Sequence, residues 1–452
     1  MNSRCNVINK TIANGGRVII MSAGICIMNR NAIALAADSA VTVGDHAAIH
    51  NSANKLFSLS RIAPVGVIVY ANASLMTVPI EIIVKQYKKQ LGDKVFPKLK
   101  DYVDDFLRYL EVKSSFFRFD LNEQSYVLQV FSDLMCGLLG DYNNFKAIAQ
   151  KNSGKPLDEE ELRKIATDAV NSTITLVNSI KKRTEYDYGK YIEGKYLSLF
   201  IELVKKDENL QFLTDEQIQE VCKKTCELYD TDFDRGGYVG VAIAGYGEDE
   251  IYPHLVHLHI GGVINNKLKY SVVESAEISE NNTASIAPLA QTDVMQTFLF
   301  GINDQFITDL SNEIPKQIDA CLNSIDDSFF ASGKKSVVHA QMNNVTGRII
   351  QHMTETARNN YMRPIIQSVA SLPIEELALL AESMINITSL RRKVAIDRNI
   401  GTVGGPIDVS IISKGDGFIW LKRKHYFDRK YNPQYFYSHF EKREEDNGYE
   451  EK

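Results

Sequence analysis

A serine, an aspartate and a lysine near the start of the chain have the types and spacing that hydrolytic chemistry needs. Ser22 precedes an apolar run at 23–27, Asp38 follows Ser22 by 16 positions, and Lys55 lies further on. A serine hydroxyl is a weak nucleophile until a base removes its proton. A serine that begins a chain carries its own base, because a free α-amine has a pKa of about 7.7 to 8.0 and is partly neutral near pH 7. Ser22 would therefore become a nucleophile if a cut before it exposed that amine.

The residues around these three extend the pattern. Apolar runs at 23–27 and 32–37 each predict a buried strand, the second ends in Ala-Ala-Asp-Ser at 36–39, and Gly44 and the Asn-Lys-Leu triplet at 54–56 follow. In this register the chain resembles the opening of a proteasome β-type subunit, as a divergent bacterial-type member of the N-terminal nucleophile (Ntn) hydrolases with large helical insertions. The resemblance implies an α+β fold, a four-layer αββα sandwich.

The same resemblance implies a role for each residue. Amide hydrolysis would proceed through an acyl-enzyme on Ser22, with its α-amine as the base and with no metal or organic cofactor. Lys55 would keep that amine unprotonated and stabilise the alkoxide, and Asp38 would hold Lys55 in place. The backbone N–H of Asn72, at a position where the family has glycine, would donate to the oxyanion. Asparagine tolerates a left-handed backbone better than most residues, so it could present that N–H.

A second landmark of the family lies far downstream. Residues 401–412 and 414–417 resemble the family's Ser-Gly-Gly turn, here with Gly404 and Gly405, and its last core hairpin. The family places a serine and an aspartate where this chain has Val403 and Ile400. Nearby polar residues could take those places by a shift of register, and the sequence leaves the choice open among Asp397, Asn399 and Thr402.

Three interpretations of residues 1–21 stay open, and they decide whether Ser22 begins a chain. The segment could be a propeptide that the enzyme removes from itself. It could be a misassigned start with the true initiator at Met21, which would be readily removed because serine is small. It could also be a secretory signal, with basic residues before the apolar stretch 18–28. That stretch continues directly into the strand pattern, which disfavours the signal.

Periodicity divides the rest of the chain. Helical spacing at 79–87 precedes helices expected at 102–110, 126–139, 158–180 and 214–228, with Asp158 and Thr214 as N-caps. Strands are expected at 237–247, 254–262, 267–273 and 284–289 with a turn at Asn265 and Asn266, and helices at 298–312, 319–328, 336–358 and 374–384. The predicted parts are a propeptide or misassigned start at 1–21, a first part of the Ntn core at 22–90, an inserted helical region at 91–235, the rest of the core with extended helices at 236–420, and a tail at 421–452.

Composition narrows the classes of function. The chain has 452 residues and a formal net charge of -6, which gives no broad attraction to nucleic acid. No segment is long and apolar enough to span a bilayer, and six scattered cysteines are typical of reduced thiols in the cytoplasm. Neither the pair Cys222 and Cys226 nor the set His254, His257 and His259 has the surroundings that predict a metal site.

Two alternatives to a peptide hydrolase stay open. One is a catalytically silent scaffold or assembly subunit of the same fold, which keeps residues 1–21. The other is an acylase that cleaves a small amide, since a fold does not fix the substrate. The expected partners are a peptide or small amide substrate and further copies of the chain, because most members of the family form rings or stacked oligomers. The basic and aromatic residues at 422–431 favour a tail that docks on a neighbouring subunit over a nucleic-acid site.

Overall fold

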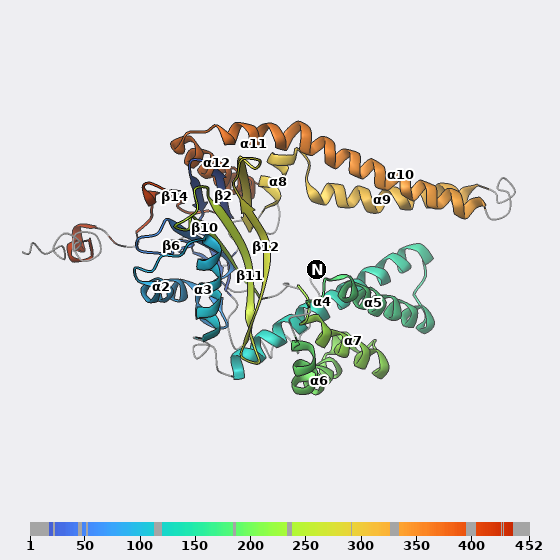
Figure 1. Ribbon diagram of the computed structural model, residues 1–452. Coiled ribbons are helices and arrows are strands. Elements are labelled where there is room, and N and C mark those ends of the chain that lie inside the picture. Colours follow the sequence, from blue (N-terminus) through green and yellow to red (C-terminus); the bar gives the residue numbers. More distant parts are fainter. Residues whose placement is uncertain are drawn as a thin grey trace, which may run out of the picture.

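Two β-sheets lie face to face at the centre of the molecule, and helices lie outside them (Figure 1). The computed structural model describes residues 18–20, 23–43, 48–50, 53–112, 120–183, 187–232, 237–290, 292–325, 334–394, 404–425, 427 and 429–436.

The larger sheet has eight strands in the order β12-β11-β10-β7-β1-β4-β5, and β6 also pairs with β7. β10 occupies one edge of β7, while β6 and β1 lie in succession along the other edge. The strands are β1 (Val18–Ile20), β4 (Val41–Val43), β5 (Ala48–His50), β6 (Leu56–Ser58), β7 (Val65–Asn72), β10 (Val239–Gly245), β11 (His254–Ile264) and β12 (Lys267–Glu277). The turn between β11 and β12 is at Asn265 and Asn266, as predicted, and both have positive φ (49° and 60°), which suits a tight hairpin.

The smaller sheet has five strands in the order β13-β2-β3-β14-β15. They are β2 (Ala23–Asn29), β3 (Ile33–Ala37), β13 (Ala284–Ala290), β14 (Asp408–Ser413) and β15 (Gly417–Lys422). A separate two-stranded ribbon, β8 (Ser74–Leu75) and β9 (Val78–Pro79), follows β7. The strands expected at 23–27, 32–37 and 284–289 are therefore confirmed.

Alternating side chains of both sheets fill the space between them. Met28 and Leu35 from the smaller sheet pack with Ile68 and Ala242 from the larger sheet, and all four are buried. The next residue along each strand points to the opposite face, because strand side chains alternate. This alternation leaves one apolar face of each sheet for the helices.

Helices cover these outer faces. On the larger sheet, Tyr87 and Phe106 from two helices belong to one buried cluster with Val67. On the smaller sheet, Leu377 belongs to a cluster with Ile25. The helices on the larger sheet are α2 (Ile80–Leu91) and α3 (Leu99–Val112), and those on the smaller sheet are α8 (Asp293–Phe300), α11 (Arg363–Ala370) and α12 (Ile374–Val394).

A bundle of four helices lies beyond the β11–β12 turn (Figure 1). Asp158 and Thr214 cap two of them as predicted, each in a capping box with the residue three positions later. The sequence did not predict α6. The bundle consists of α4 (Asp120–Ser153), α5 (Glu159–Ser179), α6 (Tyr188–Lys206) and α7 (Asp215–Leu228), with a short 3-10 turn, Glu208–Leu210, between α6 and α7.

Glu123 of α4 joins this bundle to the sheet. One carboxylate oxygen accepts hydrogen bonds from the Tyr191 hydroxyl (2.9 Å), the Lys195 ammonium (2.9 Å) and the Tyr196 hydroxyl (2.8 Å). The other accepts from the backbone N–H of Asn265 in the β11–β12 turn (2.9 Å). Burial alone would raise the pKa of Glu123, but these four donors outweigh it and hold the pKa below its usual value.

The region after α8 differs from the prediction in its boundaries. The expected helix 298–312 is wrong, because Gly301 ends α8 with a left-handed φ of 69°. A longer helix, α9 (Asp304–Ser324), then runs through the break expected before 319, with Pro315 inside it. The remaining elements are α10 (Lys334–Ala357), a π-helical turn (Arg358–Met362), a 3-10 turn (Arg429–Tyr431) and α13 (Pro433–Phe436).

The α+β class agrees with the prediction, and the strands of both sheets pair antiparallel. Within the described ranges, no helix combines the length and the apolar character that crossing a membrane requires.

We expect Glu123→Gln to lower the free energy of unfolding at pH 7 by about 1–3 kcal/mol, because charge-assisted hydrogen bonds of a carboxylate with a 12% exposed side chain are lost. The depressed pKa means that the stabilisation is fully present above the unfolded-state value of about 4.3 and is lost as the pH falls below it. Denaturant unfolding followed by circular dichroism should show the two proteins converging in acid. Glu159→Gln, at a side chain that is 91% exposed, should match the wild type at every pH, and an equal effect there would contradict the role of Glu123.

Candidate functional site

The predicted aspartate and lysine form a buried ion pair. Asp38 directly follows β3 and Lys55 directly precedes β6. The Lys55 Nζ lies 2.7 Å from Oδ1 of Asp38, with side chains 1% and 0% exposed, and it also donates to the carbonyl of Ala40 (2.6 Å). A charge buried this deeply must be paired and hydrogen-bonded to be tolerated, and both conditions hold here.

Asp38 gathers backbone from distant parts of the chain. Its Oδ1 accepts from the N–H of Ala23 (2.9 Å), and its Oδ2 accepts from the N–H of Gly404 (3.0 Å) and of Ala40 (3.3 Å). These bonds connect the start of β2 and the turn before β14 to the end of β3. The turn is further held by the Ser39 hydroxyl, which donates to the carbonyl of Pro406 (2.5 Å).

A second ion pair lies close enough to act on the first. Asp408, at the start of β14 and opposite Ala37 in the sheet, accepts from the Lys424 Nζ at 2.5 Å, and both side chains are largely buried. Burial lowers the pKa of Lys55, its contacts with Asp38 counteract part of that effect, and the charge of Lys424 lowers the pKa further. Asp408 and Lys424 have no motif of their own, so the sequence does not predict them as site residues.

Ser22 and Met21 lie outside the described residues, but the residues on either side of them are placed. Ile20 pairs with Ala71 in the larger sheet, and Ala23 pairs with Ala290 in the smaller sheet. Residues 21 and 22 therefore connect the two sheets. Because the Ala23 N–H belongs to the peptide group that begins at the Ser22 carbonyl, the bond from Ala23 to Asp38 fixes the backbone immediately after Ser22.

The left-handed backbone expected at Asn72 belongs to its neighbour. Ala71 has a φ of 68°, whereas Asn72 is not among the residues with positive φ. Ala290, opposite Ala23, also has a positive φ of 67°. Such φ values are uncommon for alanine and concentrate at functional sites. The role of Asn72 as oxyanion donor stays a prediction, and its backbone pairs with Ile19 of β1.

The polar residues expected before β14 fall in an undescribed part of the chain. Val403, Ile400 and their suggested substitutes Asp397, Asn399 and Thr402 all lie outside the described residues, as does Gly44. Gly404, which is described, reaches Asp38 through its N–H.

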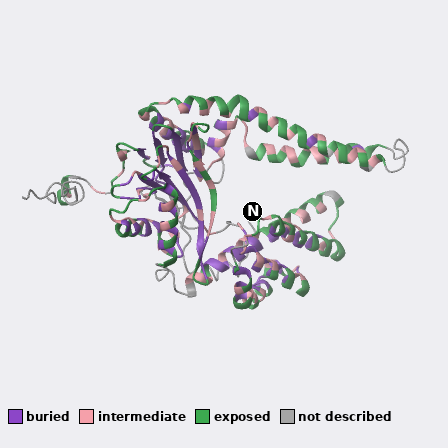
Figure 2. Ribbon diagram, in the orientation of Figure 1, coloured by how far each residue is buried: buried purple, intermediate pink, exposed green. Residues whose placement is uncertain are grey.

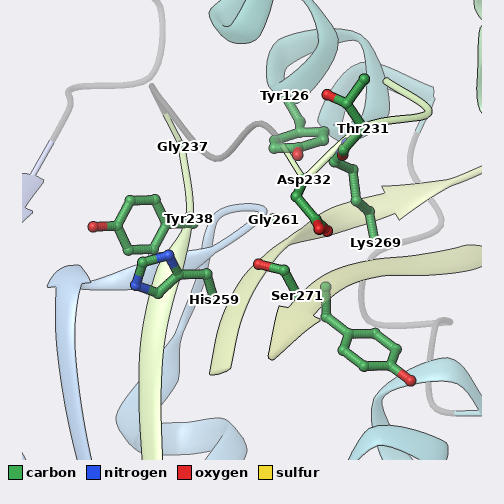
Figure 3. Close-up of a pocket in the computed structure, with 10 residues that line it drawn as sticks. Tyr126, Thr231, Asp232, Gly237, Tyr238, His259, Gly261, Lys269 and Ser271 are labelled. Carbon is green, nitrogen blue, oxygen red and sulfur yellow. The ribbon is translucent and has the colours of Figure 1, made fainter. Parts of the chain in front are cut away.

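A cluster of aromatic and histidine side chains lies close to Ala71. The Tyr70 hydroxyl hydrogen-bonds the Nε2 atoms of His257 and of His259, the latter at 2.8 Å. Burial, together with His259, lowers the pKa of His257 to about 4, so His257 is neutral at pH 7. Figure 3 shows the Tyr238 ring against the imidazole of His259, with ring centres 3.9 Å apart. No motif in the sequence signals Tyr70 or Tyr238.

A small pocket adjoins this cluster (Figure 3). Tyr238, His259 and Ser271 lie on one side of it, and Tyr126 and Asp232 lie on the other. Its volume of about 10 Å³ has room for roughly one water molecule, so an amino-acid side chain does not fit unless residues move. We therefore do not assign substrate recognition to this pocket.

No group of three or more His, Cys, Asp or Glu side chains in the part of the chain that the structure describes is arranged to hold a metal ion. His254 hydrogen-bonds Ser275 rather than joining the other two histidines, and the Cys226 thiol bonds the carbonyl of Cys222.

Comparisons with known proteins give a weak likeness. No family model and no curated protein matches the chain. Solved structures that match include a mutant of Anbu from Hyphomicrobium sp. strain MC1, with 10% identity, coverage of 95% of this chain and 99% of that chain, and a TM-score of 0.29. Another is Anbu, described as an ancestral beta-subunit, from Yersinia bercovieri, with 12% identity, coverage of 92% and 96%, and a TM-score of 0.26.

These matches correct the family assignment. The prediction that the chain is a divergent proteasome β-type subunit is wrong, because the matching solved structures are Anbu proteins at 10–12% identity and no family model supports the assignment. Both TM-scores are too low to establish a shared fold, so neither match carries a functional conclusion over to this chain.

We expect Asp38→Asn and Lys55→Met each to lower the free energy of unfolding by about 3–5 kcal/mol, because each leaves a buried charge without its partner. The double variant should lose less than the sum of the two, since it removes both charges. Denaturant unfolding in a Ser22→Ala background measures this without interference from processing. Glu202→Gln, which breaks an exposed pair with Lys206, should change stability by less than about 1 kcal/mol. Additive single effects at Asp38 and Lys55 would contradict the coupling.

Proposed function

We propose that the chain is a self-processing N-terminal nucleophile hydrolase that cleaves peptide bonds through Ser22. In this proposal Lys55 supplies the positive charge beside the nucleophile, Asp38 holds Lys55 and the backbone after Ser22, and the backbone at Ala71 and Asn72 surrounds the developing oxyanion.

The position of strand β1 carries the proposal. β1 pairs with β7 on one side, with Ile19 opposite Asn72, and with β4 on the other, with Val18 opposite Val43. Only two residues separate Ile20 from Ala23, whose N–H donates to Asp38. Consecutive Cα atoms are about 3.8 Å apart, and from this short connection we infer that the peptide bond before Ser22 is within reach of the Asp38–Lys55 pair. An extended strand thus leads a peptide bond into a charged, buried site.

Self-processing needs no group beyond these residues and water. The Ser22 hydroxyl oxygen attacks the carbonyl carbon of Met21 and forms an ester, while the hydroxyl proton ends on the departing nitrogen, which becomes the α-amine of Ser22. Water then hydrolyses the ester, leaving a carboxylate on Met21 and restoring the hydroxyl. The nearby ammonium of Lys55 favours the alkoxide-like transition state of the first step and later keeps the new amine unprotonated.

Turnover of a substrate would repeat the same chemistry. The α-amine takes the hydroxyl proton as Ser22 attacks the scissile carbonyl, the proton passes to the leaving amine, and water releases the acyl group. If β1 leaves after the cut, the place between β7 and β4 is open to another extended chain, which could pair with both by main-chain hydrogen bonds. A small amide lacks the backbone to use that place, which favours a peptide substrate over a small-amide substrate.

We also infer that the two sheets and their outer helices are a four-layer αββα sandwich. The three apolar clusters support this arrangement: one between the sheets and one on each outer face. In this interpretation residues 22–90 and 236–420 supply most of the sandwich, while β1 before them and α3 within 91–235 also belong to it. The rest of 91–235 is an insertion whose helices α4–α7 have a core of their own.

A silent scaffold is the second candidate, and one observation favours it. β1 lies within the larger sheet, between β7 and β4, rather than at an edge. If residues 1–21 stay attached, β1 blocks the place that a substrate strand would need, and the chain would serve as a structural subunit only.

The test is hydrolysis of extended fluorogenic peptides and of small acyl amides by the purified full chain. We expect peptides to be the better substrates, and Ser22→Ala to reduce turnover by a factor on the order of 10⁴ or more, because the nucleophile is removed. Ser22→Thr should keep part of the activity, since it keeps a hydroxyl. The matched control is Ser179→Ala, at an exposed serine near the end of α5, which should leave turnover unchanged.

The other outcomes decide between the candidates. Unchanged turnover in Ser22→Ala would refute the mechanism. A preference for small amides would assign an acylase, and no hydrolysis of either class together with retained residues 1–21 would assign the scaffold.

A further inference from the structure

The helices α9 and α10 form a hairpin that extends away from both sheets (Figure 1). Its two helices pack along each other, and Asp319 of α9 pairs with His339 of α10 at 2.5 Å. Figure 2 shows that most of its length is exposed. Among the described side chains of the hairpin, those that are buried are Leu322, Thr346 and Ala357.

Each helix nevertheless carries an apolar stripe that its neighbour leaves partly exposed. On α9 the apolar side chains recur every three or four positions, which places them on one face. Those from Leu310 to Cys321 line a groove of about 340 Å³, which Met342 of α10 completes. The stripe consists of Phe306, Leu310, Ile314, Ile318 and Cys321.

The exposed fractions show how much apolar surface is uncovered. Phe306 is 55% exposed and Met342 is 41% exposed. On α10, Val337 is 53% and Ile349 is 44% exposed. In a hairpin of two helices, each helix can bury one face against the other. Apolar side chains outside that face are usually covered by further helices, because packing supplies most of the stability of a helix.

Charge indicates what covers these stripes. α9 carries four carboxylates and one lysine, whereas α10 carries three basic side chains and one glutamate. In a two-fold symmetric pair of hairpins, α9 of each copy can lie between its own α10 and the α10 of the other copy. Every neighbouring pair of helices then has opposite charge. The acidic residues are Asp304, Asp309, Glu313, Asp319 and Glu355, and the basic residues are Lys316, Lys334, Lys335 and Arg348.

We propose that the α9–α10 hairpin docks against the same hairpin of a second copy of the chain and that the two form a four-helix bundle. The second copy covers both stripes at once, which a single helix from another protein does not. The acidic residues at 441–451 of the chain itself are a poor occupant, because they would face the carboxylates of α9. The proposal is independent of hydrolysis by Ser22.

The first test measures the mass of the full chain in solution by sedimentation velocity over a range of concentrations. We expect a reversible association that Ile314→Asp weakens about tenfold or more, because a carboxylate would be buried in the apolar groove. The matched control is Ile251→Asp, at an isoleucine that is 78% exposed in the loop before β11, which should associate like the wild type. Circular dichroism checks that each variant keeps its helix content.

A charge exchange tests the arrangement without changing the apolar side chains of the groove. One variant carries Asp309→Lys and Glu313→Lys, which makes both helices basic, and the other carries Lys334→Glu and Arg348→Glu, which makes both acidic. Neither should associate with itself, and an equimolar mixture should recover association, because each helix then meets one of opposite sign in the other copy.

Three results would overturn the proposal. They are a wild-type chain that is monomeric at all concentrations, an Ile314→Asp variant that associates as well as the wild type, and charge variants whose mixture behaves like each variant alone. If the wild-type chain is monomeric, a variant without residues 441–452 tests whether the chain's own end covers the groove of α9. Increased hydrogen exchange at 310–322 in that variant would identify this end as the occupant.

Discussion

The buried contact between Asp38 and Lys55 is the interaction on which the site depends. One carboxylate receives the lysine, the N–H that follows Ser22 and the N–H of Gly404, so the start of β2, the end of β3, the segment before β6 and the turn before β14 meet at one group. Two charges this deep in a protein are tolerated only when the geometry satisfies both of them. The sheets on either side, each covered by helices on its outer face, provide dry surroundings in which the attraction between the two charges is stronger than in water.

Between Ile20 of β1 and Ala23 of β2 the chain passes from one sheet to the other, and Ala23 donates to Asp38. β1 completes the larger sheet beside β7, and β2 begins the smaller sheet beside β13, with Met21 and Ser22 between them. A cut between Met21 and Ser22 would disconnect β1 from β2 without interrupting either strand. The positive φ values of Ala71 and Ala290, one in each sheet, lie opposite the residues that flank the crossing. Backbone strain at both sides of one short segment agrees with a functional constraint there.

The sequence predicted the local features well and the long-range ones poorly. The N-caps at Asp158 and Thr214 and the Asn265–Asn266 turn depend on neighbouring residues only, and all three are as expected. The prediction that Asp38 holds Lys55 was based on a motif resemblance. The two side chains do form an ion pair, although the family assigned from that resemblance was wrong. The insertion of β1 beside β7 and the contact of Tyr70 with two histidines depend on pairing between distant segments, which periodicity does not report. The left-handed backbone of Gly301, which ends α8, has no signal in the neighbouring residues. The helical spacing of the apolar residues around it therefore predicted one continuous helix.

In the proposed mechanism, the strand before Ser22 delivers the bond that the site cuts. The most direct measurement is the intact mass of the wild-type chain after expression from Met1, with a fragment-ion reading of its first residues. We expect a chain that begins at Ser22. A wild-type chain that retains residues 1–21 would contradict the mechanism, because β1 would then be a permanent strand of the sheet and Ser22 would have no amine.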